Sequence, residues 1–272
     1  MSPERSKTVY YASIGPALIA HDVDADGAAL LRRSAVTLPA NIQYVWPHPS
    51  RRTLYAVSSN GGPQVTGDTH RANALAVDPA TGALRLHGPA AVLPSRPIHT
   101  SVDRRGQYLL TAYNNPSHIT VHRLNADGSI GAEVAQPAEL DTGIYAHQVL
   151  AAPDNNTVLL VTRGNDAKPG KPEDPGAIKT YRFADGVLRN LASIAPGTGL
   201  GFGPRHLDFH PERPWVYVSI ERQNKLYVYA RTTRPGLPAS RCSSRTRWRT
   251  RPRGCAKPPA RSMSTRTASS ST

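Results

Sequence analysis

The feature that most constrains this chain is a unit of about 50 residues that occurs four times. Each copy contains a short polar turn, and these turns lie at residues 49–52, 104–106, 153–156 and 211–214. Their first residues are 55, 49 and 58 positions apart. Five residues after each turn begins, an apolar residue opens a short hydrophobic run: Leu54, Leu109, Val158 and Val216. A regular repeat of this length predicts an architecture built by stacking similar units.

Each unit contains four short strand-like runs separated by turns, and helical spacing is almost absent. Units of about 50 residues with four strands are typical of the blades of a β-propeller. One blade cannot bury both of its faces, so blades stack against their neighbours. A β-sandwich with accidental internal similarity is the alternative. The recurrence of one strand order in four copies favours an all-β propeller of four-stranded blades.

The repeat also predicts the domain organisation. Three blades are complete, at about residues 39–95, 96–140 and 141–196. Residues 7–38 supply strands two to four of another blade, and residues 203–230 supply three strands of a last one. No alternating apolar strand follows Tyr229. We therefore expect residues 1–230 to form a partial propeller of about four to five blades, with an unclosed ring, and residues 231–272 to form a basic disordered tail.

The positive charge is concentrated in the tail. Residues 231–272 contain ten Arg, one Lys and no acidic residue, whereas residues 1–230 carry 22 basic and 19 acidic residues. The formal charge of +14 therefore predicts no specific nucleic-acid partner for the propeller, although the tail can bind polyanions non-specifically. The abrupt loss of repeat and acidic residues favours a reading-frame slip over an evolved basic arm. Both cysteines, Cys242 and Cys255, also lie there, so no disulfide framework supports the propeller.

Two absences bear on location. No apolar run is long enough to span a membrane. The first 20 residues have no uninterrupted apolar segment of the kind found in signal peptides. The sequence therefore predicts a cytoplasmic protein without a membrane partner.

The repeat places candidate functional residues at equivalent positions. In a propeller, the first strand of each blade lines the central channel. Six residues before the turn marker, these strands carry Gln43, Ile98, His147 and Arg205, and one residue later they carry Tyr44, His99, Gln148 and His206. The ends of the second strands carry Ser59, Asn114, Arg163 and Glu221. We therefore expect His147 and Arg205 to lie side by side at one mouth of the channel, with Glu221 near Arg205.

Several motifs resemble one protein family. They are Gly203-Pro204-Arg205-His206, Ser219-Ile220-Glu221-Arg222 and Thr162-Arg163-Gly164-Asn165. Together with the repeat, residues 8–230 resemble the lactonase family of seven-bladed propellers. That family includes bacterial 6-phosphogluconolactonases and fungal carboxy-cis,cis-muconate lactonising enzymes. Compared with the family, the chain lacks about two blades and the closing strand.

The resemblance implies a channel site with a His, an Arg, a Glu and a further Arg from a later blade. His147, Arg205 and Glu221 match the first three as catalytic residues, and the later Arg has no counterpart here. Arg205 would bind a developing oxyanion or a substrate anion. His147, titrating near neutrality, would serve as general acid or base. Glu221 would activate water or fix Arg205. Four further residues are predicted to bind substrate: His99, His206, Asn114 and Arg163.

The implied activity is hydrolysis of a sugar lactone, impaired by truncation, with 6-phosphogluconolactone as the leading substrate and no cofactor. A lactonising cyclase and a non-catalytic propeller scaffold are the alternatives. Arg205 and Glu221 can also form a purely structural ion pair, and His99 and His206 can bond a neighbouring blade. No tight ligand spacing predicts a metal site. No Gly-x-Ser-x-Gly elbow supports a serine nucleophile.

Overall fold

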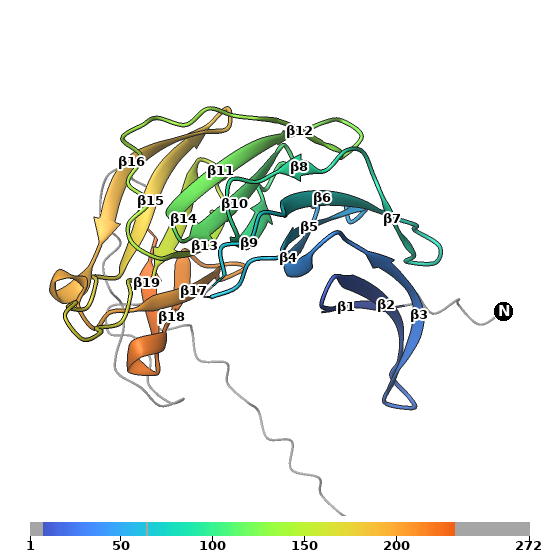
Figure 1. Cartoon of the computed structure of the whole chain (residues 1–272), viewed down its shortest axis with the longest axis horizontal. Helices are drawn as coiled ribbons and strands as arrows, with labels where there is room; N and C mark the ends of the chain where they lie inside the picture. The colour runs from blue at the N-terminus through green and yellow to red at the C-terminus, as the bar shows by residue number, and fades with distance from the viewer. Residues whose placement is uncertain (1–7, 64, 232–272) are drawn as a thin grey trace, which may run out of the picture.

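The computed structural model describes residues 8–63 and 65–231, and nearly all regular structure in that part of the chain is β-strand. The strands form five antiparallel sheets that follow one another along the chain and stand around an open arc (Figure 1). The helical elements described are two short 3-10 turns, η1 (Pro196–Gly199) and η2 (Glu221–Gln223). The predicted all-β propeller with an unclosed ring is confirmed.

The three central sheets have the four strands of a blade. One holds β4 (Asn41–Pro47), β5 (Thr53–Ser59), β6 (His70–Val77) and β7 (Leu84–Leu86), and β8 (Ala91–Val92) also pairs with β6. The next holds β9 (Pro97–Val102), β10 (Tyr108–Asn114), β11 (Ser117–Leu124) and β12 (Ile130–Glu133). The last of these three, the fourth sheet of the chain, holds β13 (Ala146–Ala151), β14 (Thr157–Thr162), β15 (Ala177–Ala184) and β16 (Val187–Ile194).

The two terminal sheets each have three strands in the described residues. The first holds β1 (Val9–Ile14), β2 (Ala17–Asp24) and β3 (Ala29–Thr37). The last holds β17 (Pro204–Phe209), β18 (Trp215–Ile220) and β19 (Lys225–Ala230). Both agree with the strand content predicted for residues 7–38 and 203–230. The rest of the predicted tail, from residue 232, lies outside the described residues.

The first strands of successive blades lie next to one another. β4 contacts β9, β9 contacts β13, and β13 contacts β17, although each pair belongs to different sheets. These four strands therefore line the inner side of the arc, as the repeat predicts. Residues near the starts of neighbouring inner strands also pack on each other, Tyr44 on His99 and His147 on His206, so these starts share one mouth of the channel.

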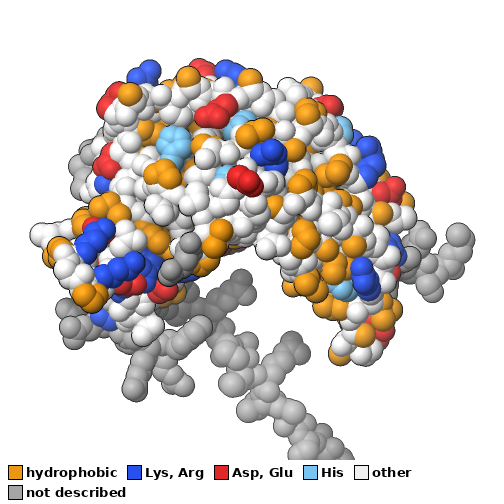
Figure 2. Space-filling view, viewed as in Figure 1, with side chains coloured by type: hydrophobic (Ala, Val, Ile, Leu, Met, Phe, Trp, Pro, Cys, Tyr) orange, Lys and Arg blue, Asp and Glu red, His pale blue; other side chains and the backbone are white. Residues whose placement is uncertain are grey.

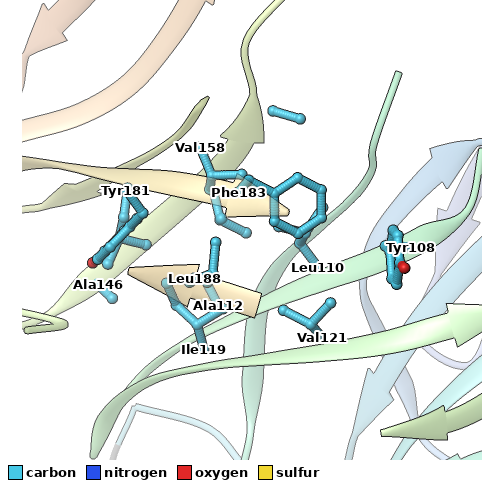
Figure 3. Close-up of a cluster of buried hydrophobic side chains, with 13 residues drawn as sticks. Tyr108, Leu110, Ala112, Ile119, Val121, Ala146, Val158, Tyr181, Phe183 and Leu188 are labelled. Carbon is cyan, nitrogen blue, oxygen red and sulfur yellow. The ribbon is translucent and has the colours of Figure 1, made fainter. Parts of the chain in front are cut away.

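The core is divided among the interfaces between successive sheets. Figure 3 shows the cluster between the third and fourth sheets, where Leu110 and Val121 of one sheet meet Val158 and Phe183 of the other. On β14, Val158 and Leu160 face this interface, whereas Leu159 and Val161 face the last sheet. Alternate side chains of a strand point to opposite faces, so a blade packed on both sides needs a continuous apolar strand.

The terminal sheets leave apolar side chains uncovered among the described residues. Tyr10, Leu30 and Leu31 of the first sheet and Leu226 of the last are more than half exposed. Figure 2 shows the opening between these two sheets as a wide hollow in the molecular outline. The apolar positions that mark the repeat are instead buried: Leu54, Leu109, Val158 and Val216.

Candidate functional site

A β-bulge interrupts each inner strand at the same repeat position. The pairing with the second strand skips one residue between Ile42 and Tyr44, between Pro97 and His99, between Ala146 and Gln148, and between Pro204 and His206. The skipped residues are those aligned from the repeat: Gln43, Ile98, His147 and Arg205. A bulge redirects a side chain and ends regular pairing, and bulges are common beside active sites. The bulges give the predicted equivalence of these four positions a structural basis.

Glu221 lies at the centre of the candidate site. Arg163 Nε donates a hydrogen bond of 2.7 Å and Arg205 Nη1 one of 2.9 Å, both to Glu221 Oε2. Among the described residues, no hydrogen bond reaches Glu221 Oε1, and the side chain is 38% exposed. Despite partial burial, which acts in the opposite direction, the two arginines hold the pKa of Glu221 below its ordinary value. The carboxylate is therefore ionised and has one oxygen free for a ligand or water.

Arg163 and Arg205 differ in exposure and in the number of hydrogen bonds that they donate within the protein. Arg163 is 14% exposed, and all three of its nitrogens donate within the protein, to Glu221, to the Gly164 carbonyl and to Asp166. Arg205 is 36% exposed and donates through Nη1 alone among the described residues. Arg205 therefore has donors available for a substrate, whereas Arg163 anchors Glu221. The substrate contact of Arg163 stays a prediction.

The ion pairs continue away from Glu221 into the loop between β14 and β15. Asp166 accepts hydrogen bonds from Arg163 Nη2 and, at 3.1 Å, from Arg222 Nε, and Arg222 also pairs with Glu173. Asp166 and Arg222 are absent from the residues predicted from the sequence. Arg222 directly follows Glu221 in a quoted motif, and Asp166 stands three residues after Arg163. That spacing is the one sequence signal that could have identified Asp166.

Three histidines from consecutive inner strands lie beside this cluster. The rings of His147 and His206 meet edge to face with centroids 4.9 Å apart. His99 is 1% exposed and packs 4.2 Å from the ring of Tyr44, and His147 is 5% exposed. Neither ring nitrogen of His99 or His147 has a hydrogen-bond partner in the described part of the chain. Buried polar atoms normally have partners, so these four nitrogens are exceptions that a water molecule or a ligand atom would satisfy.

The titration expected of His147 is wrong. Burial, followed by the charge of Arg205, lowers the pKa of His147 to about 3. Burial, with smaller effects of His206 and His147, likewise holds the pKa of His99 well below its ordinary value. The pKa of His206 is lowered by partial burial and by Arg205. His147 is therefore neutral at pH 7 and does not titrate near neutrality.

Asn114 is not joined to this cluster by any hydrogen bond of the described residues. It ends β10 directly before the cis peptide bond Asn115-Pro116. In residues 8–63 and 65–231, no three side chains of His, Cys, Asp or Glu are grouped so as to hold a metal ion. No helix of the described residues is long and apolar enough to cross a membrane.

Comparison with known protein families identifies the family to which this fold belongs. The family model described as "Lactonase, 7-bladed beta-propeller" matches residues 6–248. The chain belongs to the lactonase family of seven-bladed β-propellers. The resemblance read from the sequence is thus confirmed, and the match extends past residue 230, where that resemblance ends.

Curated members of the lactonase family are similar over most of this chain. It is 27% identical over 214 residues to 6-phosphogluconolactonase of Bacillus subtilis strain 168, covering 75% of this chain and 56% of that protein. It is 29% identical over 224 residues to 6-phosphogluconolactonase of Klebsiella pneumoniae subsp. pneumoniae, covering 82% of this chain and 61% of that protein. The chain therefore spans a little over half the length of these curated relatives.

Solved structures of the same architecture superpose on the chain. The periplasmic gluconolactonase of Pseudomonas aeruginosa has a TM-score of 0.66 at 22% identity, covering 87% of this chain and 68% of that one. A protein from Lactobacillus plantarum has a TM-score of 0.62 at 20% identity, covering 86% and 64%. At these identities the likeness shows a shared fold alone.

Proposed function

We propose that the site around Glu221 hydrolyses a sugar lactone, with 6-phosphogluconolactone as the leading substrate. The observation that carries the proposal is the carboxylate of Glu221, which two arginines hold by one oxygen while its other oxygen has no partner among the described residues. The names of the curated relatives support the substrate class. The fold alone does not determine the reaction, so the proposal rests on the site.

Glu221 is assigned as the base. Its free oxygen, Oε1, accepts a proton from a water molecule as the water oxygen attacks the lactone carbonyl carbon. This step forms a C–O bond and a tetrahedral oxyanion, and leaves Glu221 protonated. As the bond between that carbon and the ring oxygen breaks, Glu221 returns the proton to the ring oxygen. The products are the open-chain acid and an unchanged enzyme.

Arg205 is assigned to the oxyanion. Its Nη1 is held by Glu221, and its Nε and Nη2 have no acceptor in the described part of the chain. A guanidinium fixed in this way points a charged donor at the oxygen where negative charge develops. Because the bond to Glu221 exists before substrate binds, little reorganisation is needed during the reaction.

The histidines are assigned to substrate hydroxyl groups. Since the pKa of His147 is lowered to about 3, this side chain stays neutral and keeps one N–H donor and one bare nitrogen. It can therefore donate to one hydroxyl and accept from another. His206 contacts the His147 ring from the exposed side of the inner strand, so it meets the same ligand nearer the solvent.

The test compares Glu221→Gln with Glu212→Gln. Glu212 lies in the exposed turn of the same sheet, and its side chain makes no hydrogen bond with described residues. Acid release from freshly prepared 6-phosphogluconolactone is measured above the spontaneous rate. Loss of the base is expected to lower kcat by about 100-fold or more, and Glu212→Gln should behave as the unaltered chain. Turnover that survives Glu221→Gln, or is absent from the unaltered chain, would reject the proposal.

A further inference from the structure

Arg96 and Gln43 form a tethered pair at the same mouth of the channel. Arg96 directly precedes β9, and its Nε donates a hydrogen bond of 3.0 Å to Oε1 of Gln43, the bulged residue of β4. Gln43 Nε2 in turn donates to the Asn41 carbonyl at 3.1 Å. Both ends of the Gln43 amide are therefore engaged, which fixes the oxygen toward Arg96.

The charge of Arg96 is not balanced by a carboxylate. Arg163, Arg205 and Arg222 each contact an acidic side chain. Arg96, which is half-buried, makes no ion pair among the described residues, and its Nη1 and Nη2 donate no hydrogen bond there. A guanidinium held through Nε presents its two Nη atoms as a fork, and this geometry matches a phosphate or carboxylate.

The pair lies at the level of the proposed catalytic cluster. Gln43 occupies the bulge position that carries His147 on β13 and Arg205 on β17. Its neighbour Tyr44 packs on His99 of β9, β9 contacts β13, and His147 of β13 packs on His206 of β17. A continuous set of inner-strand side chains therefore connects the Gln43 position to the catalytic cluster along one mouth.

We infer that Arg96, oriented by Gln43, binds the phosphate of a phosphorylated sugar lactone. The inference rests on the proposed function, because it assigns the far end of the same substrate. Lactone and phosphate then contact different arginines: Arg205 binds the reacting carbonyl and Arg96 binds the dianion. The neutral histidines between them face the hydroxyl-bearing carbons.

Kinetics of two substrates test this assignment. Arg96→Gln should raise KM for 6-phosphogluconolactone roughly 10- to 100-fold, the value of a charge-assisted pair, with kcat unchanged. KM for unphosphorylated gluconolactone should not change. Arg96→Lys should recover part of the loss, since it keeps the charge without the fork. Gln43→Leu should raise the same KM less than Arg96→Gln does, because it removes the tether alone.

Arg105→Gln is the matched control. Arg105 stands exposed in the turn at the opposite end of β9, and its side chain makes no hydrogen bond with described residues. The KM of the Arg105→Gln variant for both substrates should equal that of the unaltered chain. An equal rise of KM for both substrates in Arg96→Gln would assign Arg96 a structural role and overturn the inference.

Calorimetry separates this inference from the proposed reaction. The unaltered chain should bind 6-phosphogluconate more tightly than gluconate, and Arg96→Gln should abolish that difference. If this holds while lactone turnover is absent, the phosphate site stands and the proposed reaction fails. If turnover is present and Arg96→Gln binds 6-phosphogluconate normally, the phosphate site fails. Equal or undetectable binding of both acids by the unaltered chain also overturns the phosphate site.

Discussion

Arg163 directly follows β14 and Glu221 directly follows β18, strands of adjacent sheets, and Arg163 Nε lies 2.7 Å from Glu221 Oε2. Arg205, on β17, which pairs with β18, reaches the same oxygen at 2.9 Å. Two blades therefore meet at one carboxylate oxygen. Because both arginines use Oε2, the orientation of Glu221 depends on the packing between the blades, and the other oxygen is available for chemistry.

The two arginines should respond differently to replacement by lysine. A lysine at position 163 has one nitrogen and cannot bond Glu221, Asp166 and the Gly164 carbonyl together. Arg163→Lys is therefore expected to reduce the free energy of unfolding by about 1–2 kcal/mol, measured by urea denaturation.

Arg205→Lys should show the opposite pattern. Its side chain makes one hydrogen bond among the described residues and is partly exposed, so the urea midpoint should change little. Lactone turnover should fall about 10-fold or more, because the forked donor is lost. A large stability loss in Arg205→Lys with normal kcat would reverse the two assignments.

The loop after β14 offers a test of how Arg163 is held. Gly164 has a φ of +70°, and a Cβ there would lie 2.3 Å from the Asp174 carbonyl oxygen. Gly170 has a φ of +76°, but a Cβ there would meet nothing within 4 Å. Both alanine variants carry the cost of a left-handed residue, about 1–2 kcal/mol. Gly164→Ala should cost more by urea denaturation and also lower turnover, whereas Gly170→Ala should leave turnover unchanged.

The sequence was sufficient for the fold and for part of the site. Aligning four turns identified the strands, and it identified Gln43, Ile98, His147 and Arg205 as equivalent, because each blade repeats the same bulge. The contact between Glu221 and Arg205 followed because Arg205 lies at the start of one strand and Glu221 directly follows the end of the neighbouring antiparallel strand. Regular elements repeat their geometry, so residue counting is enough to align them.

The remaining features depend on packing that no repeat encodes. The contacts of Asp166 with Arg163 and Arg222 are made by the loop 163–176, where no regular strand pairing fixes the register, so residue counting could not predict them. The titration of His147 depends on its burial and on its distance from a positive charge. A sequence pattern contains neither quantity.

The core between the third and fourth sheets should be sensitive to cavities. Leu160 is fully buried in the cluster between these two sheets, whereas Leu226 on β19 is 58% exposed. Leu160→Ala is expected to cost about 2–5 kcal/mol of unfolding free energy through lost contacts and residual cavity volume. Leu226→Ala should stay within about 0.5 kcal/mol. Similar costs for both variants, in one urea series, would contradict the assignment of the core to the sheet interfaces.

The acid stability of the chain should depend on His147. Its pKa falls from 6.5 to about 3 on folding, so between these pH values the unfolded state binds a proton that the folded state does not. The stabilisation is complete above pH 6.5 and is lost as the pH falls toward 3, at about 1.4 kcal/mol per pH unit. His147→Asn removes this proton uptake, so its unfolding free energy should fall less steeply between pH 6 and 4 than that of the unaltered chain. Arg205→Gln should also reduce the slope, because the Arg205 charge is the second cause of the low pKa. The measurement is a urea titration at each pH, and parallel slopes for the unaltered chain and His147→Asn would show that His147 is protonated in the folded state.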